Sequence, residues 1–238
     1  KGQMVKEVDV LGGIMGFFAD LSTLQSKTLN MSKGRSVWSP RAQVDKRQYE
    51  TIVTSMVLRN GNIDVLLGEA VELLVRHYTV TGVALRDGSS VFGKAVVLTC
   101  GTFLSGLIHV GERKILAGRM GEEGSIGITE SLASLGFKTG RLKTGTPPRL
   151  NKKSIDWSKA SVALGDDFPV PFSYQTRDFT PPNVPCHTLR TNHETHNIIM
   201  DNVGRSPMFS GDVAGVGPRY CPSIEDKVHR FSHHDSHT

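Results

Sequence analysis

Apolar residues follow two different periods along the chain, and together these periods predict a mixed α/β protein. Apolar positions recur every three or four residues from residue 1 to about 20, and again from after Pro40 to about Arg59, which predicts two helices. The segments 63–75 and 80–101 are rich in branched residues, as strands are. A further helix is expected with Ser125 as its N-cap and Gly136 just beyond its end.

The segment 80–101 carries two more specific signals. The dipeptide Asp87-Gly88 predicts a hairpin, because a type I′ turn needs positive φ angles. The run AVVLT (95–99) is continuously apolar, which is typical of a strand buried on both faces. Such a strand leads into Gly101 and Thr102, at the place where a doubly wound sheet holds a dinucleotide. A core strand followed by a turn glycine explains the same letters, so both interpretations stay open.

The composition changes near residue 150, where Pro, Asp, Phe and Ser become more frequent. This change predicts two domains, 1–150 and 151–238, the second incomplete at its C-terminal end. The first residues read as the middle of a helix, so we expect the chain to be a fragment. No stretch approaches the roughly 18 apolar residues of a membrane span, and no secretory signal precedes the first helix.

Charge and cysteine content narrow the class of protein only slightly. The net charge of +5 in 238 residues favours anionic partners without identifying nucleic acid. Cys100, Cys186 and Cys221 form no CxxC pair, which argues against a zinc knuckle or a redox dithiol. Reduced thiols are typical of the cytoplasm. No metal site is expected, since His193 and His196 lack the spacing of a zinc-protease helix.

Cys221 is the strongest candidate for a chemical residue. Pro222 holds its backbone extended, and Arg219 and Lys227 could lower the pKa of its thiol. Ser223 can cap a helix beginning at Ile224, close to this thiol. A buried structural cysteine is the alternative interpretation.

Two other segments suit anionic ligands. The loop 138–150 carries Arg141, Lys143 and Arg149 between glycines and a Pro-Pro pair, which suits phosphate contacts, although a solvated surface loop is equally consistent. The glycine-rich segment 118–127 opens a helix, so Ser125 could face a phosphate or a flavin edge, or be a plain N-cap. No GxGxxG follows a strand in this chain.

Several long strings together resemble one family in their order along nearly the whole chain. They are KGxxVKEVDxLGG, LNxSKG, RAQxDK, AVVLTxGTFL, GRLKTGTPPR, RSPM and GVGPRYCPSIEDKV. They resemble the MnmG/GidA family of tRNA uridine 5-carboxymethylaminomethyl-modification enzymes. The resemblance implies a glutathione-reductase-like, Rossmann-type FAD domain, here incomplete (1–150), with an inserted second α/β domain that takes NADH (151–238).

The resemblance also implies a reaction and its partners. Members work with the GTPase MnmE and add an aminomethyl-type group to carbon 5 of the wobble uridine of tRNA. NADH reduces the flavin, and methylene-tetrahydrofolate supplies the one-carbon unit. A cytoplasmic homodimer without a membrane span is expected.

The family motifs assign roles to residues of this chain. Val71 and Ser125 match FAD contacts, and Cys221 matches a cysteine implicated in catalysis. Arg141, Lys143, Arg149 and Arg219 are expected at phosphates of tRNA or of a cofactor. The NAD segment matches Gly217, Pro218, Arg219, Tyr220, Cys221, Pro222, Ser223, Ile224, Glu225, Asp226 and Lys227.

The chain also departs from the family pattern. The family's GxGxxG and a second cysteine are expected upstream of Lys1. The segment that closes the FAD site and the helical domain that docks MnmE and tRNA are expected downstream. The chain alone is therefore expected to be inactive. Two alternatives remain open: a folate- and FAD-dependent tRNA uridine methyltransferase, and a non-catalytic interaction protein with a flavoprotein fold.

Overall fold

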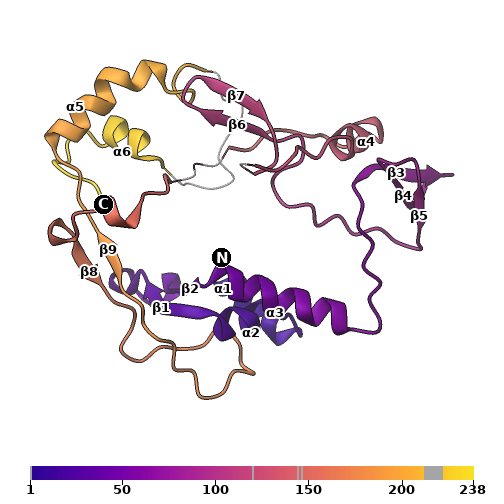
Figure 1. The fold of residues 1–238 in the computed structure, drawn as a ribbon, viewed down its shortest axis with the longest axis horizontal. Helices are drawn as coiled ribbons and strands as arrows, with labels where there is room; N and C mark the ends of the chain where they lie inside the picture. The colour runs from indigo at the N-terminus through magenta and orange to yellow at the C-terminus, as the bar shows by residue number, and fades with distance from the viewer. Residues whose placement is uncertain (1, 120, 144, 146, 212–221) are drawn as a thin grey trace. The chain divides into compact units, whose positions relative to one another are not determined.

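The computed structural model describes residues 2–119, 121–143, 145, 147–211 and 222–238 (Figure 1). Its contacts divide the chain into two compact units, one of Lys1–Val65 with Asn151–Leu189, the other of Leu66–Leu150 with Arg190–Thr238. Each unit therefore joins two segments distant in sequence. The expected division into 1–150 and 151–238, and the roles given to those two domains, stay predictions.

The helices of the first unit begin and end at identifiable residues. The single helix expected from residue 1 to about 20 is two helices, α1 (Gly2–Val10) and α2 (Met15–Leu21). They are separated at Gly12, which has φ +90°, a left-handed conformation that breaks a helix. The next helix, α3 (Lys46–Arg59), ends as predicted but begins later than predicted, because the Asp45 carboxylate accepts the N–H groups of Arg47 and Gln48.

Residues 41–44, expected in a helix, belong to a strand instead. The strand β2 (Ser39–Val44) pairs antiparallel with β1 (Thr23–Leu29), and the 3-10 turns η1 (Met31–Lys33) and η2 (Arg35–Val37) lie between them. Pairing along six positions satisfies the backbone of both segments, which explains why no helix starts after Pro40.

A buried glutamine joins the two segments of the first unit. Gln25 on β1 is 1% exposed and donates its amide hydrogens to the carbonyls of Ala163 and Val184 at 3.0 and 2.9 Å. These carbonyls flank the short antiparallel pair β8 (Ser161–Ala163) and β9 (Cys186–Thr188). The turns η3 (Lys152–Ser154) and η4 (Trp157–Lys159) precede this pair.

Two buried aspartates clamp the loop 172–176 in the same unit. Asp20, 7% exposed, accepts the N–H groups of Phe172 and Ser173 at 2.8 and 2.9 Å and the hydroxyl of Thr176 at 2.6 Å. Asp9, 4% exposed, accepts the N–H of Tyr174 at 2.9 Å. Because buried carboxylates need such donors, the loop and the first two helices order one another.

In the second unit a three-stranded antiparallel sheet carries one helix. The strands are β3 (Ala70–Arg76), β4 (Thr79–Leu85) and β5 (Ser90–Phe92), in that order. The helix α4 (Ile128–Ser134) packs on β3, where the Leu73 N–H donates to the Ser131 hydroxyl at 2.9 Å. The hairpin of β6 (Leu107–Val110) and β7 (Arg113–Leu116) lies between them in sequence.

The hairpin predicted at Asp87-Gly88 is confirmed between β4 and β5, but its turn type is not. Gly88 has φ +88°, whereas Asp87 is not among the described residues with positive φ, so the turn is not type I′. The Gly88 N–H donates to the Leu85 carbonyl at 3.0 Å, and the Asp87 carboxylate accepts the Ser89 N–H at 2.9 Å. One residue with positive φ, Gly88, is therefore enough to form this turn.

The buried strand predicted at residues 95–99 is not formed. These residues have no strand partner among the described residues, and Val97 is 81% exposed. Residues 63–69, also expected in strands, likewise belong to no strand, and Leu67 is 92% exposed. A strand buried on both faces needs hydrogen-bonded neighbours and cover, and no described segment supplies them. The mixed α/β class is confirmed, while a parallel Rossmann-type sheet stays a prediction.

The described part of residues 190–238 carries the other helices of the second unit. The helices α5 (His193–Asn202) and α6 (Ile224–Arg230) lie side by side, and η5 (Val203–Arg205) follows α5 directly (Figure 1). The Thr191 N–H donates to the His237 carbonyl at 2.9 Å, and the His237 N–H returns a bond to the Thr191 hydroxyl at 2.8 Å. Across the described part of the chain, every helix is too short or too polar to span a membrane.

We predict that Asp20→Asn opens the clamped loop without unfolding the protein. The amide of asparagine offers one acceptor oxygen where the carboxylate offers two, so a buried N–H loses its partner. Amide exchange in residues 172–176 should accelerate about 10- to 100-fold, on the order of 1–3 kcal/mol of local opening free energy. Hydrogen exchange with mass spectrometry measures it, with the exposed Asp64→Asn as control. Equal exchange in both variants would contradict the clamp.

Candidate functional site

The candidate site is built where a glycine turn meets the first strand of the three-stranded sheet. Gly127 has φ +120°, and a Cβ added to it would lie 2.5 Å from the Val71 carbonyl oxygen and 2.9 Å from the Val71 Cβ. No side chain fits in that space, so only glycine lets the turn at 124–127 lie directly against β3. Of the two predicted FAD contacts, Val71 lies against Gly127, and Ser125 precedes that glycine by two residues.

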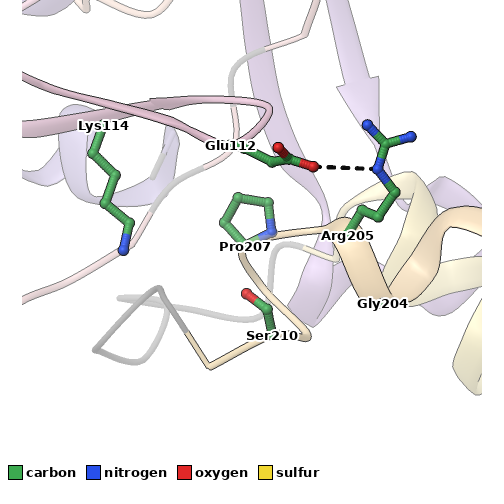
Figure 2. A pocket seen from close by; sticks show the side chains of 6 residues that line it. All are labelled: Glu112, Lys114, Gly204, Arg205, Pro207 and Ser210. Carbon is green, nitrogen blue, oxygen red and sulfur yellow. Dashed lines mark hydrogen bonds and ion pairs between the residues drawn. The ribbon is translucent and has the colours of Figure 1, made fainter.

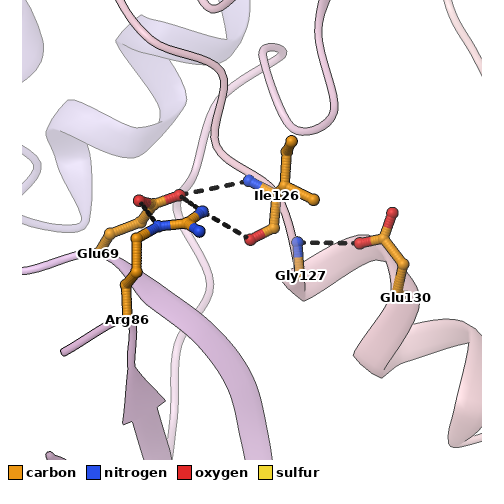
Figure 3. Close-up of polar contacts among 5 residues, drawn as sticks. All are labelled: Glu69, Arg86, Ile126, Gly127 and Glu130. Atoms are coloured by element: carbon orange, nitrogen blue, oxygen red, sulfur yellow. Dashed lines mark hydrogen bonds and ion pairs between the residues drawn. The ribbon is translucent and has the colours of Figure 1, made fainter. Parts of the chain in front are cut away.

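An ion pair holds the turn from the side of the sheet (Figure 3). The Glu69 carboxylate pairs with the Arg86 guanidinium through Nε and through Nη2, the latter at 2.7 Å, and also accepts the Ile126 N–H at 3.3 Å. Arg86 Nη2 in turn donates to the Ile126 carbonyl at 3.4 Å. Both polar groups of Ile126 are therefore held by one bidentate pair.

This pairing shifts the titration of both groups. The Arg86 hydrogen bond is the main reason that the pKa of Glu69 falls from 4.5 to about 2; partial burial opposes the shift, and the Ile126 N–H adds to it. The same hydrogen bond raises the pKa of Arg86. Both side chains are thus charged throughout the physiological range.

The N-cap residue of α4 is Gly127 and not the predicted cap, Ser125. The Glu130 carboxylate accepts the Gly127 N–H at 2.9 Å. The close contact with Val71 places the chain reversal at Gly127, two residues later than the sequence suggested. Ser125 instead forms a parallel bridge with Leu104, and its carbonyl accepts the Ser105 N–H at 2.8 Å.

These bonds decide which part of a cofactor the turn can take. The N–H groups of Ile126 and Gly127 point at the carboxylates of Glu69 and Glu130, so neither donor is directed at a ligand. Neither of these two N–H groups is therefore left to bind a phosphate.

Gly101 and Thr102 lie in an exposed turn shortly before Leu104, the residue that bridges Ser125. Gly101 has φ +67°, which explains the glycine there. The structure thus links this turn to the Val71–Ser125 region through Leu104. A cofactor contact at Gly101 or Thr102 stays a prediction.

The basic loop is partly engaged within the chain. Arg141 Nη1 donates to the Ser105 carbonyl at 3.1 Å, and Lys143 Nζ lies 3.6 Å from the Asp226 carboxylate and 3.6 Å from the Met208 sulfur. Arg149 is exposed. Phosphate contacts at these three residues stay predictions, and at Lys143 a phosphate would have to compete with Asp226.

The cap predicted at Ser223 is confirmed. The Ser223 hydroxyl accepts the Asp226 N–H at 3.2 Å, and α6 begins at Ile224. Asp226 is 8% exposed, and its carboxylate also meets Lys143 at 3.6 Å and Arg230 at 3.5 Å. The Asp226 carboxylate therefore has a structural role: it connects the basic loop to α6, the helix that follows Cys221 in sequence.

The remaining predicted NAD residues divide into two groups. Pro222, Ser223, Glu225 and Lys227 are half-buried and Ile224 is exposed, and Lys227 Nζ donates to the Thr238 carbonyl at 2.8 Å. The other predicted residues lie outside the described part of the chain: Gly217, Pro218, Arg219, Tyr220 and Cys221. The catalytic role of Cys221 and the NAD contacts stay predictions.

Sequence reasoning missed Glu69 and Arg86. The hairpin of β3 and β4, which turns at His77 and Tyr78, pairs Ala70 with Leu85 and so places Glu69 across from Arg86. Their backbones meet as well, since the Arg86 N–H donates to the Glu69 carbonyl at 2.9 Å. Opposite charges facing each other at a hairpin end were the available signal.

A mixed α/β protein with a glycine turn packed on a sheet strand is consistent with a cofactor-binding class, and comparisons with known proteins define it further. The whole chain, residues 1–238, matches the family model described as glucose inhibited division protein A. The chain belongs to this family.

Individual relatives and a solved structure agree with the family. The tRNA uridine 5-carboxymethylaminomethyl modification enzyme MnmG of Bdellovibrio bacteriovorus is 48% identical over 238 residues, 100% of this chain and 37% of the relative. The MnmG of Thermodesulfovibrio yellowstonii is 46% identical over 237 residues, 100% of this chain and 38% of the relative. Form I crystals of Aquifex aeolicus GidA give a TM-score of 0.89 at 41% identity, covering 100% of this chain and 41% of that one.

We predict an acid-dependent loosening of the turn at Ile126. Since the pKa of Glu69 is lowered to about 2 from 4.5, the stabilisation is complete above about 4.5 and is lost as the pH falls through about 2. The carboxyl carbon of Glu69, followed by NMR in 13C-labelled protein, should titrate near 2. In Arg86→Met its midpoint should rise toward 4.5, and an unchanged midpoint would contradict the pairing.

Proposed function

We propose that the protein, at its full length, is an FAD-dependent enzyme that modifies the wobble uridine of tRNA. It would add an aminomethyl-type group to carbon 5 of the uridine. The observation that carries the proposal is the identity of 46–48% across the entire chain to two proteins named as tRNA uridine 5-carboxymethylaminomethyl modification enzymes. The chain spans 37–38% of those relatives, so the activity is assigned to the longer protein.

The candidate site supports a flavin in this role. Val71 lies against Gly127 in the turn that also holds Ser125, and the N–H groups of Ile126 and Gly127 there are taken by carboxylates, which suits contact with the uncharged part of FAD. Bound FAD would supply two-electron redox chemistry. The chain's own contribution is to hold the turn rigidly through Gly127 and the Glu69–Arg86 pair, so that one face of the ligand meets a fixed surface.

Other parts of the proposal concern the ligands around the flavin. NADH would reduce it, bound along residues 217–227, and methylene-tetrahydrofolate would donate the one-carbon unit. Cys221 would act on the uridine ring as a nucleophile or as an acid–base group. The protein would work in the cytoplasm as a homodimer with the GTPase MnmE.

The test of this function is Cys221→Ser in the full-length protein, expressed in cells that lack their own copy of the enzyme. Loss of a group that attacks or protonates the uridine should lower modification by about 10²- to 10⁴-fold. Nucleoside mass spectrometry of purified tRNA measures the modified uridine. The matched control is Cys100→Ser, because Cys100 is an exposed free thiol.

Two outcomes would contradict different parts of the proposal. Wild-type levels of the modified uridine in Cys221→Ser would reject a chemical role for this thiol. Absence of the modification in cells complemented with the wild-type protein would reject the proposed function itself.

A further inference from the structure

A polar pocket in the second unit has no role in the candidate cofactor site. Its volume is about 310 Å³, and it lies between the tip of the β6–β7 hairpin and the segment that follows α5 (Figure 2). The lining residues are Glu112, Lys114, Gly204, Arg205, Pro207 and Ser210.

The chain around Pro207 folds so that a hydroxyl joins the pocket. Pro207 fixes its own φ within a tight turn, in which the N–H groups of Phe209 and Ser210 both donate to the Ser206 carbonyl at 2.9 Å. This turn brings Ser210 back toward Pro207 (Figure 2). On the opposite wall, a Cβ added to Gly204 would meet no atom within 4 Å, so that wall is open space.

The pocket carries two cations and one anion. Lys114 comes from β7 and Arg205 from η5, so two separate elements each contribute a positive charge. Arg205 Nε donates to the Glu112 carboxylate at 3.3 Å, and its Nη1 donates to Asn202 at 3.3 Å. The Glu112 and Arg205 side chains are 73% and 72% exposed, so water screens their pairing and an exchange of partners costs little.

We propose that this pocket is a subsite for a phosphate of the RNA backbone, which replaces Glu112 as the partner of Arg205. A guanidinium presents donors in a fork that matches two phosphate oxygens, and Lys114 adds a second charge. The inference rests on the proposed tRNA substrate.

The other source of such a phosphate is a dinucleotide cofactor, and the pocket suits RNA better. Dinucleotide diphosphates sit where backbone N–H groups converge at a glycine turn or helix start. Here the cations are side chains, highly exposed, with open space at Gly204, which suits a polymer passing across the surface. Phosphate contacts from exposed arginine and lysine position RNA without reading its sequence.

Binding of tRNA to the full-length protein over a range of salt concentrations tests the inference. Arg205→Ala should weaken binding about 10-fold and reduce the slope of log affinity against log salt by about one. The control is Arg113→Ala, which removes the same charge from the residue between Glu112 and Lys114, where the side chain is exposed and does not line the pocket. Its effect should be clearly smaller.

A second variant is expected to change tRNA affinity in the opposite direction. Glu112→Gln removes the carboxylate that competes for Arg205, so tRNA should bind several-fold more tightly at low salt. NADH affinity should be the same in Arg205→Ala as in wild type.

Some contrary outcomes would overturn the phosphate subsite alone, and one would also overturn the proposed function. Equal losses of tRNA affinity in Arg205→Ala and Arg113→Ala, weaker tRNA binding in Glu112→Gln, or a loss of NADH affinity in Arg205→Ala would overturn the phosphate subsite. A wild-type protein that binds no tRNA would overturn the proposed function, and this inference with it.

Discussion

The close approach of Gly127 to Val71 is the constraint on which the candidate cofactor site depends. A side chain at residue 127 would lie 2.5 Å from the Val71 carbonyl oxygen, so the turn reaches the strand only because this residue is glycine. Once the turn lies there, Ile126 comes within reach of Glu69 and the Gly127 N–H within reach of Glu130. Ser125 is then placed to bridge Leu104. One missing side chain therefore organises three segments of the chain.

Two surfaces of the second unit differ in the charged groups that they carry, and so in the ligands that they suit. At the turn, the carboxylates of Glu69 and Glu130 take the N–H groups of Ile126 and Gly127, so neither donor is left for a phosphate. At the pocket, Arg205 pairs with the exposed Glu112 carboxylate, which an incoming phosphate would replace under our proposal. An enzyme that holds a flavin and a polyanionic substrate at once needs both kinds of surface.

Several local signals were read correctly from the sequence, although the N-cap predicted at Ser125 was wrong, and the non-local interactions were missed. Gly136 ends α4 as predicted, with the Phe137 N–H donating to the Leu132 carbonyl at 3.1 Å, because a left-handed glycine cap depends on neighbouring residues alone. The apolar run 95–99 predicted a buried strand, but burial depends on what covers the run, and no described segment covers it. The Glu69–Arg86 pair and the buried Gln25 depend on partners distant in sequence, which periodicity does not reveal.

The most direct test of this account is the flavin content of a Gly127→Ala variant of the full-length protein. The added methyl must push the turn away from Val71 and strain a backbone at φ +120°. The ratio of flavin to protein, measured by absorbance after purification, should fall about tenfold or more. The control, Gly61→Ala, adds a methyl where nothing lies within 4 Å and should keep the wild-type ratio. A Gly127→Ala protein that retains its full flavin content would contradict the account.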